Sequence, residues 1–326
     1  MNIESKLRPL YLAKILLSQT DDEHSLTTNE LSEILEREYH ISAHRTTIGE
    51  DIKVLAQAGL DVDTIKSTQN RFRILSRDFD IAELKLLIDA VESSKFITEK
   101  RSDTLIEKLQ RQASIHSAEA LKRNLRACSR FKPDNEEVIY IADAANAAIN
   151  AGKKISFQYF DYNARKEKEL RNGGNAYSFS PYYLIWDGDC YYMVGYSDKH
   201  QNIGNFRMDR VYQQPTILPE DAVPVPSDFD INEYVSTSFR MYNSERRKVE
   251  LICDNSTMDA MLDRFGMEVE TRENDAESFL AVVNVAVSHV FYGWVFGFGG
   301  KVKIKGPEDV RAGYAAILRE AEKAIR

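Results

Sequence analysis

An Asp-Gly pair at residues 187–188, set between two aromatic-rich apolar runs, constrains the fold of this chain more than any other feature. The runs cover residues 177–186 and 190–196, and an Asp-Gly step between such runs is typical of a tight β-hairpin turn. A third run, residues 206–211, carries two arginines. A guanidinium binds phosphate or carboxylate, and aromatic faces bind a base or ring. The stretch therefore predicts a sheet beside a site for a planar, anionic ligand; an ordinary sheet core with arginines in surface ion pairs is the alternative.

The hydrophobic pattern extends this sheet toward the N-terminus. Ile155, Phe157 and Tyr159 stand at alternate positions, the period of a half-buried strand. A turn around residues 163–164 leads to a further extended segment, and an alanine-rich helix that ends at Gly152 precedes the strands. With the hairpin and the third run, these segments predict a small antiparallel sheet that curls into a barrel.

The first 60 residues have the pattern of three short helices. Residues 4–18 are amphipathic, and Thr27 followed by Glu30 is a capping-box start for a second helix. We expect a third helix to begin near Ser42, a good N-cap, and to stop at Gly59. Short successive helices with a brief turn between the second and third indicate a helix-turn-helix.

Two short strands around a polar turn at residues 67–70 follow the third helix. The chain from Thr64 to Arg77 contains four basic residues and no acidic one, although the protein as a whole has a net charge of −8. A basic hairpin of this kind is suited to follow a phosphate backbone. The segment is therefore predicted to be the wing of a winged helix-turn-helix.

The third predicted helix has a polar face opposite its apolar stripe. If this helix enters the major groove, its N-terminal half meets the bases. Thr46 and Thr47 would contact base edges or phosphates, Glu50 would accept from a cytosine amino group, and Arg45 at the helix start would contact a phosphate. The alternative for each is an exposed side chain without a role. The full set predicted to contact DNA is Arg45, Thr46, Thr47, Glu50, Lys53, Lys66, Arg71 and Arg73.

Two helices are predicted over residues 80–113, with Asp80 as the N-cap of the first. Their apolar stripes need a partner, which is either the same chain or a second copy. Farther along, four of the eight prolines lie in residues 215–226, which predicts a linker. Strands and helices then alternate in the order β-α-β-α-β-α, and Pro307 opens the last helix.

Composition excludes several classes of protein. No apolar run is long enough to span a membrane and the N-terminus has no signal-peptide pattern, so we expect a cytoplasmic protein. Three isolated cysteines argue against a disulfide framework, and the six histidines lack metal-binding spacing. Residues 297–301 are too short for a phosphate-binding loop, and no nucleophile elbow occurs. We expect no catalytic site, no metal and no cofactor.

The stretch that begins near Pro181 and ends in Phe206-Arg-Met-Asp-Arg-Val211 resembles the WYL domain of bacterial transcription regulators. The eponymous Trp-Tyr-Leu is Tyr191-Tyr192-Met193 here, so two of its three letters differ. Residues 1–76 resemble the winged helix-turn-helix that precedes WYL domains, with Glu50 where the family often has a basic residue. Residues 83–98 resemble the linker of these regulators, and residues 291–307 resemble the C-terminal extension that often follows a WYL domain (WCX).

The resemblance implies an α+β multidomain protein with four parts. These are a winged helix-turn-helix at residues 1–76, a helical linker or dimerisation region at 77–133, a WYL domain with an SH3- or Sm-like barrel at 134–218, and a C-terminal α/β extension at 219–326. It also implies a homodimeric transcription regulator that binds operator DNA and senses an anionic effector, such as a nucleotide or short nucleic acid. The linker would relay effector occupancy.

We expect the effector to bind where Tyr159, Ser180, Tyr192, Arg207 and Arg210 converge on one rim of the sheet. Arg207 and Arg210 differ by three positions and would point to opposite faces of an ideal strand, so convergence requires a bulge or a strand end near Asp209. Arg210 pairing with an acidic neighbour such as Asp209 is the alternative. Two other functions are weighed: an RNA- or single-strand-binding module that acts through the barrel, and a nucleotide hydrolase, for which no catalytic constellation exists.

Overall fold

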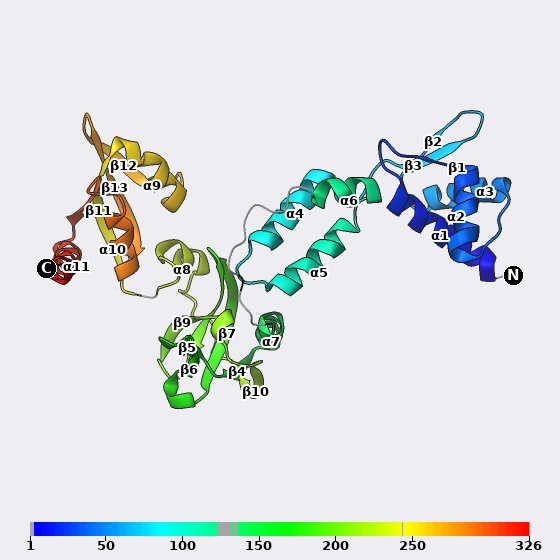
Figure 1. Ribbon diagram of the computed structural model, residues 1–326. Helices are drawn as coiled ribbons and strands as arrows, with labels where there is room; N and C mark the ends of the chain where they lie inside the picture. The colour runs from blue at the N-terminus through cyan, green and yellow to red at the C-terminus, as the bar shows by residue number, and fades with distance from the viewer. Residues whose placement is uncertain (1–2, 123–131, 133–135, 243, 326) are drawn as a thin grey trace. The chain divides into compact units, whose positions relative to one another are not determined.

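The computed structural model describes residues 3–122, 132, 136–242 and 244–325 (Figure 1). The chain divides into two compact units, Met1–Glu136 and Glu137–Arg326, which we describe separately. The described residues form eleven α-helices and several sheets, which is a mixed α and β fold. No helix in this part of the chain combines the length and the apolar character that a membrane span requires.

Unit 1 begins with three helices and a small sheet. The helices are α1 (Ile3–Gln19), α2 (Thr28–Tyr39) and α3 (Arg45–Gln57), and the strands are β1 (Leu26–Thr27), β2 (Val62–Ile65) and β3 (Arg71–Ile74). The antiparallel sheet has the order β1-β3-β2. The apolar stripes of the three helices and the inward side chains of β3 form one core, which includes Leu12, Leu16, Leu31, Leu35, Ile48, Ile52, Phe72 and Ile74. The predicted helices and the β2–β3 hairpin are therefore present.

The helix starts show how local sequence fixes this part of the fold. Thr27 forms the predicted capping box, because its side chain accepts from the Glu30 N–H while the Glu30 carboxylate accepts from the Thr27 N–H. The expected N-cap of α3 is wrong. His44 caps this helix in place of Ser42, and its ring nitrogen Nδ1 accepts from the Thr46 N–H at 3.5 Å. The helix therefore begins at Arg45, three residues after Ser42.

The remaining helices of unit 1 are α4 (Ile81–Ser93), α5 (Glu99–Gln110) and α6 (Ile115–Lys122). Asp80 caps α4 as predicted and forms a capping box with Glu83. The three helices share a small core that includes Leu84, Ile88 and Ile106. The predicted boundary between residues 133 and 134 lies outside the described residues.

Unit 2 begins with α7 (Val138–Ala151), whose C-terminus is closed by Gly152 in the left-handed conformation. A five-stranded antiparallel sheet follows, with the order β10-β4-β7-β8-β9. Its strands are β4 (Lys153–Phe157), β7 (Tyr177–Asp187), β8 (Cys190–Ser197), β9 (Asn202–Arg207) and β10 (Thr216–Asp221). Two further strands, β5 (Phe160–Tyr162) and β6 (Lys168–Leu170), form a separate hairpin. Closure of the five-stranded sheet into a barrel stays a prediction.

The hairpin predicted at Asp187-Gly188 is confirmed. Asp187 pairs with Cys190, which leaves Gly188 and Asp189 as the turn residues, and Gly188 has a φ of 57°. Glycine adopts such a φ at little cost, so Gly188 fixes the place of this turn.

The proline-rich segment is not a linker throughout, contrary to the prediction. Residues 216–221 form β10, which pairs antiparallel with β4 at the edge of the sheet. Proline lacks an N–H and is therefore tolerated on an edge strand, which explains how Pro219 can lie inside β10. The predicted boundary between residues 218 and 219 falls inside this strand.

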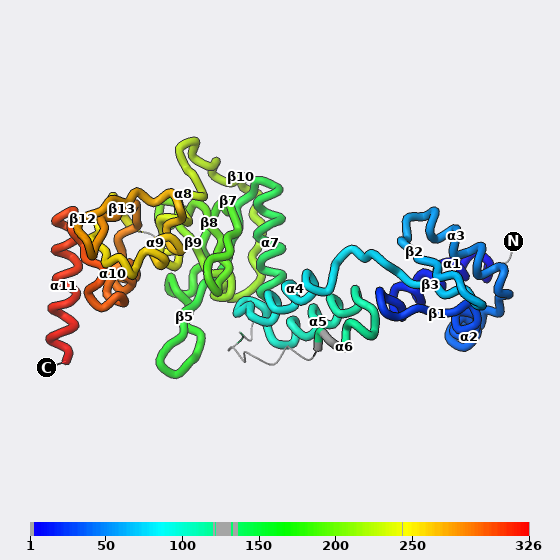
Figure 2. Tube along the Cα trace, turned by 90° about the horizontal axis from the view of Figure 1, so that it is seen from above, coloured from blue at the N-terminus to red at the C-terminus, as the bar shows by residue number. Residues whose placement is uncertain are grey.

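The C-terminal part of unit 2 has α8 (Ile231–Thr237) and then a four-stranded antiparallel sheet. Its elements, in chain order, are β11 (Arg246–Asp254), α9 (Met258–Phe265), β12 (Glu270–Asp275), β13 (Ser278–Ala286), α10 (His289–Phe296), β14 (Val302–Gly306) and α11 (Glu308–Ile325). The sheet order β12-β13-β11-β14 is that of a ferredoxin-like βαββαβ unit. The sequence pattern did not reveal α8 and β12, so the predicted alternation of strands and helices is wrong at β12. Figure 2 shows α11, the last helix of the chain, lying beside this sheet.

Candidate functional site

The first candidate surface is the polar face of α3. Ile48, Ile52 and Leu55 are buried in the core of the three helices, so this stripe orients the helix. Arg45, Thr46, Glu50 and Lys53 are exposed and Thr47 is half-buried. The structure thus places the predicted α3 residues on the solvent-facing side of one helix.

A buried ion pair holds α3 against α1. Arg8 Nε donates to Asp51 Oδ2 at 2.5 Å, and the two side chains are 14% and 12% exposed. Asp51 follows Glu50 directly in the sequence but points into unit 1, as expected for a structural anchor. The pair lies on the same inward side of α3 as the apolar stripe and adds to its attachment to α1.

The basic residues of the β2–β3 hairpin differ in whether they have hydrogen-bond or ion-pair partners. Arg71 donates to the hydroxyl and the carbonyl oxygen of Ser25, at 2.9 and 2.8 Å. Arg73 pairs with Asp63 at 2.9 Å. Lys66 is exposed in the turn and, within the described chain, has no carboxylate at ion-pair distance; the same is true of Arg45 and Lys53. Arg71 and Arg73 therefore shape the hairpin, whereas Arg45, Lys53 and Lys66 are the available cations.

The second candidate surface surrounds the end of β9. The strand ends at Arg207, and the chain turns through a 3-10 segment, Met208–Arg210. This is the strand end near Asp209 that convergence of the two arginines requires. The two arginines nevertheless have different partners: Arg207 pairs with Asp209 at 2.7 Å, and Arg210 lies 4.0 Å from Asp161. The suggested pairing of Arg210 with Asp209 is therefore replaced by pairing of Arg207 with Asp209.

Asp161 connects Arg210 to an arginine that the sequence pattern did not reveal. The Arg171 guanidinium binds Asp161 with two hydrogen bonds, and its Nη2–Oδ1 distance is 3.0 Å. The hydrogen bonds to Asp161 raise the pKa of Arg171. The same guanidinium lies over the Tyr159 ring, 5.3 Å from its centroid. We call Tyr159, Asp161, Tyr162, Arg171 and Arg210 the Asp161 cluster.

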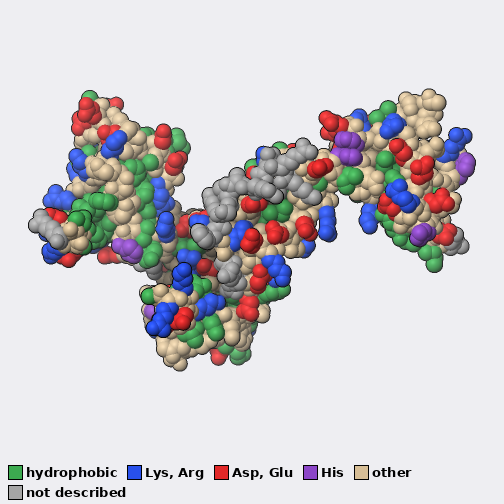
Figure 3. Space-filling model, in the orientation of Figure 1, with side chains coloured by type: hydrophobic (Ala, Val, Ile, Leu, Met, Phe, Trp, Pro, Cys, Tyr) green, Lys and Arg blue, Asp and Glu red, His purple; other side chains and the backbone are tan. Residues whose placement is uncertain are grey.

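The sheet brings the members of the Asp161 cluster together from distant positions. Tyr159 forms an isolated bridge with Val211, so the β5 strand passes beside the segment that carries Arg210. The β5–β6 hairpin pairs Asp161 with Glu169, which places Arg171 just beyond the paired strand. Arg210 Cζ lies 4.9 Å from the centroid of the Tyr162 ring. Figure 3 shows lysine and arginine side chains gathered over the part of unit 2 that contains β5 and β6.

Tyr159 is the largely buried member of this cluster. Its ring meets Phe206 edge-on, with 5.1 Å between the centroids. Its hydroxyl accepts a hydrogen bond from the Arg207 N–H at 3.2 Å. Burial raises the pKa of Tyr159 to about 12, so the hydroxyl stays neutral at physiological pH.

Two of the predicted effector residues are not at this surface. Ser180 is fully buried, and its Oγ accepts from the Val223 N–H at 2.9 Å. Tyr192 pairs with Arg207 and is buried in a core with Val194, Tyr234 and Met241. Its neighbour Met193 pairs with Phe206, so Tyr192 and Tyr159 face opposite sides of the sheet. Of the five predicted residues, the structure joins Tyr159 and Arg210 in one cluster and pairs Arg207 with Tyr192, whose side chain lies on the other face of the sheet.

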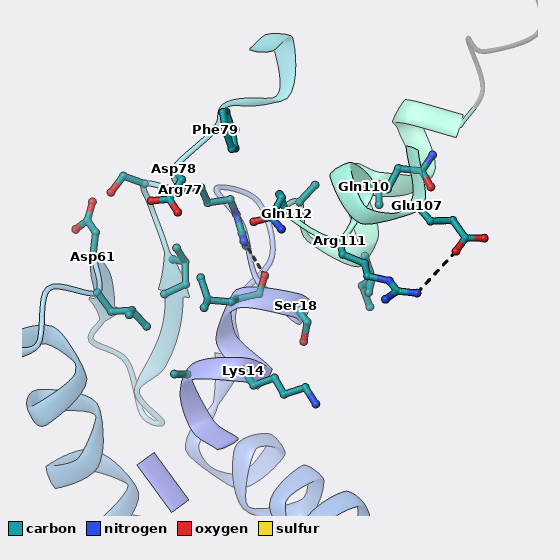
Figure 4. Close-up of a pocket in the computed structure, with 18 of the residues that line it drawn as sticks. Lys14, Ser18, Asp61, Arg77, Asp78, Phe79, Glu107, Gln110, Arg111 and Gln112 are labelled. Atoms are coloured by element: carbon teal, nitrogen blue, oxygen red, sulfur yellow. Dashed lines mark hydrogen bonds and ion pairs between the residues drawn. The ribbon is translucent and has the colours of Figure 1, made fainter. Parts of the chain in front are cut away.

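A cavity of about 1370 Å³ opens in unit 1, between α1, the end of β3, α5 and α6 (Figure 4). Arg77 reaches from its wall to the carbonyl oxygens of Leu17 and Thr20, at 2.7 and 2.5 Å. Its lining mixes apolar side chains with charges of both signs, among them Lys14, Asp61, Asp103 and Glu107. None of the predicted binding residues lines this cavity. No group of three potential metal ligands occurs among the described residues.

Comparison with known proteins assigns two parts of the chain to domain families. Residues 141–216 match the family model of the WYL domain, and residues 245–321 match that of the WCX domain. The Asp161 cluster thus lies within the WYL domain. No curated protein matches the sequence.

Among solved structures, the chain is similar to proteasome accessory factor B/C (PafBC) of Arthrobacter aurescens, with 19% identity and a TM-score of 0.29. The match covers 95% of this chain and 46% of that one, so the chain spans about half the length of PafBC. A structure described as a CRISPR Cas-related protein matches at 12% identity and a TM-score of 0.37, over 100% of this chain and 92% of that one.

Proposed function

We propose that this protein is a sequence-specific DNA-binding transcription regulator whose WYL domain senses an anionic, nucleotide-like effector. The WYL and WCX domains support this class of protein. The observation that carries the DNA-binding part is the polar face of α3, which stays free while the opposite face closes the core of unit 1. We propose binding and regulation, and no catalysis.

The arrangement of unit 1 supports a winged helix-turn-helix at residues 1–76. The order of α1, α2, α3 and the β2–β3 hairpin is that of this motif, and α3 takes the place of the recognition helix. Thr46, Thr47 and Glu50 would read base edges, and Arg45, Lys53 and Lys66 would contact phosphates first because no carboxylate holds them. Arg71 and Arg73 would add phosphate contacts from positions fixed by their own partners.

We propose that the regulator is a homodimer whose helical region, at residues 77–133, contributes to the dimer. Leu86 is 70% exposed on α4, and Ile81 and Leu87 are about 40% exposed. Such apolar surface is stabilised when a second copy covers it. The effector must bind one dimer geometry more tightly than another, because a ligand with equal affinity for both shifts nothing.

For the effector site we propose the WYL domain, within residues 134–218, followed by the C-terminal extension at 219–326. Arg210 would contact the effector directly, and Arg207 would take part after release from Asp209. Tyr159 would support Arg210 and Arg171 from below, because it is largely buried. Tyr192 and Ser180 would support the strands that carry these groups, because both are buried.

The proposal is tested by selecting duplexes from a random DNA library with the full-length protein. Enrichment of one sequence with two-fold symmetry is expected, since a dimer reads two half-sites. Lys53→Ala and Arg45→Ala should weaken binding to every duplex, and each should reduce the salt slope by about 0.9, the contribution of one neutralised phosphate. The matched control is Lys248→Ala, which removes an exposed lysine of β11, outside both candidate surfaces. Selection without enrichment, or α3 variants that bind like the wild type, would contradict the assignment.

A second candidate is a single-stranded nucleic-acid or RNA-binding module that acts through the WYL domain. The Asp161 cluster favours it, because an exposed tyrosine such as Tyr162 beside arginines can bind bases and phosphates without reading sequence. The two functions differ in which surface matters: α3 variants should abolish duplex binding under the first, and Arg171→Ala should abolish single-strand binding under the second.

A further inference from the structure

We infer that Asp161 occupies the place of an anionic ligand, so that the Asp161 cluster is a phosphate site closed by the protein's own carboxylate. Arg171 and Arg210 would hold the phosphate, and Tyr162 would contact an attached base. This inference rests on the proposed effector function and adds to it the two residues Asp161 and Arg171. The ligand it defines is a phosphate that carries an aromatic base, either a mononucleotide or a short single strand.

The distances place one carboxylate between two guanidiniums. Asp161 Oδ1 lies 3.0 Å from Arg171 Nη2 and 4.0 Å from Arg210 Nη1. Both carboxylate oxygens contact Arg171, and Arg210, at 4.0 Å, lies beyond hydrogen-bond distance. A phosphate offers more oxygens and more negative charge, so it can hydrogen-bond both guanidiniums at once. Two arginines and one aspartate also leave the cluster with one uncompensated positive charge.

The Asp161 carboxylate is exposed to solvent, so a phosphate can displace it. The side chains of Asp161 and Arg171 are 47% and 52% exposed. An ion pair in contact with solvent is weak, because water screens it and solvates both partners after separation. The Arg8–Asp51 pair of unit 1 shows the opposite case, since both of its side chains are largely buried. Asp161 therefore holds the two arginines in position without closing the site permanently.

Aromatic side chains provide the surface for a base. Tyr162 is 52% exposed and lies under Arg210, and Tyr212 is 37% exposed on the far side of Phe160. Lys168 adds a third cation, with Nζ 4.7 Å from the Phe160 centroid. Exposed tyrosine faces beside cations are the features that bind successive bases of a single strand.

The experiment measures binding of three probes to the full-length protein: a 5′-phosphorylated oligothymidine of about eight nucleotides, thymidine monophosphate, and inorganic phosphate. Asp161→Asn keeps the shape of the side chain and removes its charge. We expect it to tighten binding of the base-bearing probes about three- to tenfold, the worth of one or two solvent-exposed ion pairs. Asp221→Asn is the matched control, because Asp221 also forms an exposed pair, with Lys153 at 2.7 Å.

Arg171→Ala in the Asp161→Asn background completes the test. It should abolish the tighter binding produced by Asp161→Asn and, for the oligonucleotide, reduce the salt slope by about 0.7. Tighter binding of the oligonucleotide alone identifies a single strand as the ligand, and tighter binding of both nucleotides identifies a mononucleotide. The inference is overturned if Asp161→Asn binds the probes equally or more weakly than the wild type. It is also overturned if the Asp221→Asn control binds them more tightly, or if no probe binds at all. Duplex binding measured on the same preparations reports separately on the proposed function, because α3 carries it.

Discussion

The Arg71 guanidinium donates a hydrogen bond to the carbonyl oxygen of Ser25, with 2.8 Å between Nη2 and the oxygen. Its Nε also donates to the Ser25 hydroxyl. The contact ties β3 to the residue that precedes β1, so an arginine proposed to contact a phosphate also supports the fold of unit 1. The basic residues of this hairpin can thus have two roles, which are to stabilise the fold and to contact a phosphate.

We therefore expect Arg71→Ala to destabilise the protein, lowering the free energy of unfolding by about 1–2 kcal/mol because two hydrogen bonds are removed. Lys66→Ala is the matched control: it should leave stability unchanged and, if DNA is bound as proposed, reduce the salt slope by about 0.9. Urea unfolding and DNA titrations at several salt concentrations measure both effects. An Arg71→Ala protein as stable as the wild type would contradict the structural role.

Loss of the Arg8–Asp51 ion pair should lower the free energy of unfolding more than Arg71→Ala does. Arg8→Ala leaves the Asp51 carboxylate buried without its partner and should cost about 3 kcal/mol of unfolding free energy. Asp51→Asn removes the charge that needs a partner, so the double variant should be more stable than the sum of the single changes implies. Thermal or urea unfolding of the four proteins gives the coupling energy. Additive effects would show that the two side chains do not stabilise α3 together.

Gly195 predicts a steric effect in the WYL domain. A Cβ at this position would lie 2.1 Å from the Ser180 carbonyl oxygen and 2.8 Å from the Phe179 ring. Gly195→Ala should therefore cost about 2–3 kcal/mol of unfolding free energy, because backbone must move to admit the methyl group. Gly204, the cross-strand partner of Gly195, has no such neighbour within 4 Å. Gly204→Ala should change stability by less than about 1 kcal/mol, and equal effects of the two substitutions would refute the steric explanation.

Local features of the fold could be predicted from the sequence because short-range chemistry decides them. Thr27 and Glu30 form both halves of a capping box, and Gly188 supplies the positive φ at the hairpin turn. The incorrect predictions have the opposite cause, because tertiary contacts decide them. Ser42 and His44 both offer a side-chain acceptor near the start of α3, and the choice between them depends on how the preceding loop packs. The β10 strand exists because β4 offers it hydrogen bonds, which the proline content of the segment conceals.

The candidate site was predictable only in part. Arg207 and Arg210 stand close together in a strand-like run, which drew attention to them, but their carboxylate partners are set by tertiary contacts. Arg171 lies far from Arg210 in the sequence and reaches Asp161 only because β5 and β6 pair. No periodicity marks Arg171, and the pairing of β5 with β6 would have been the only signal. Exposed α3 residues, in contrast, follow from helix geometry alone.

The last prediction concerns Asp21, which lies between the helices of unit 1. Burial alone would raise its pKa, but the hydrogen bond from Ser114 at 2.5 Å, the contact with the His24 ring, and the N–H groups of Glu23 and His24 more than offset it. The pKa of Asp21 is therefore held well below its usual range. Because His24 also stacks on His116, these contacts join the loop after α1 to α6.

A carboxyl whose folded pKa is depressed stabilises the fold above its unfolded pKa of about 3.9, and this stabilisation is lost as the pH falls through the folded value. Asp21→Asn should therefore be less stable than the wild type at pH 7 and at pH 5, and the two unfolding curves should converge as the pH falls below about 4. Asp22→Asn, a neighbour without these contacts, should follow the wild type throughout. Urea unfolding across this range checks the result, and a stability difference between Asp21→Asn and the wild type that stays constant into acid would show that the ionised carboxylate is not what joins α6 to the loop.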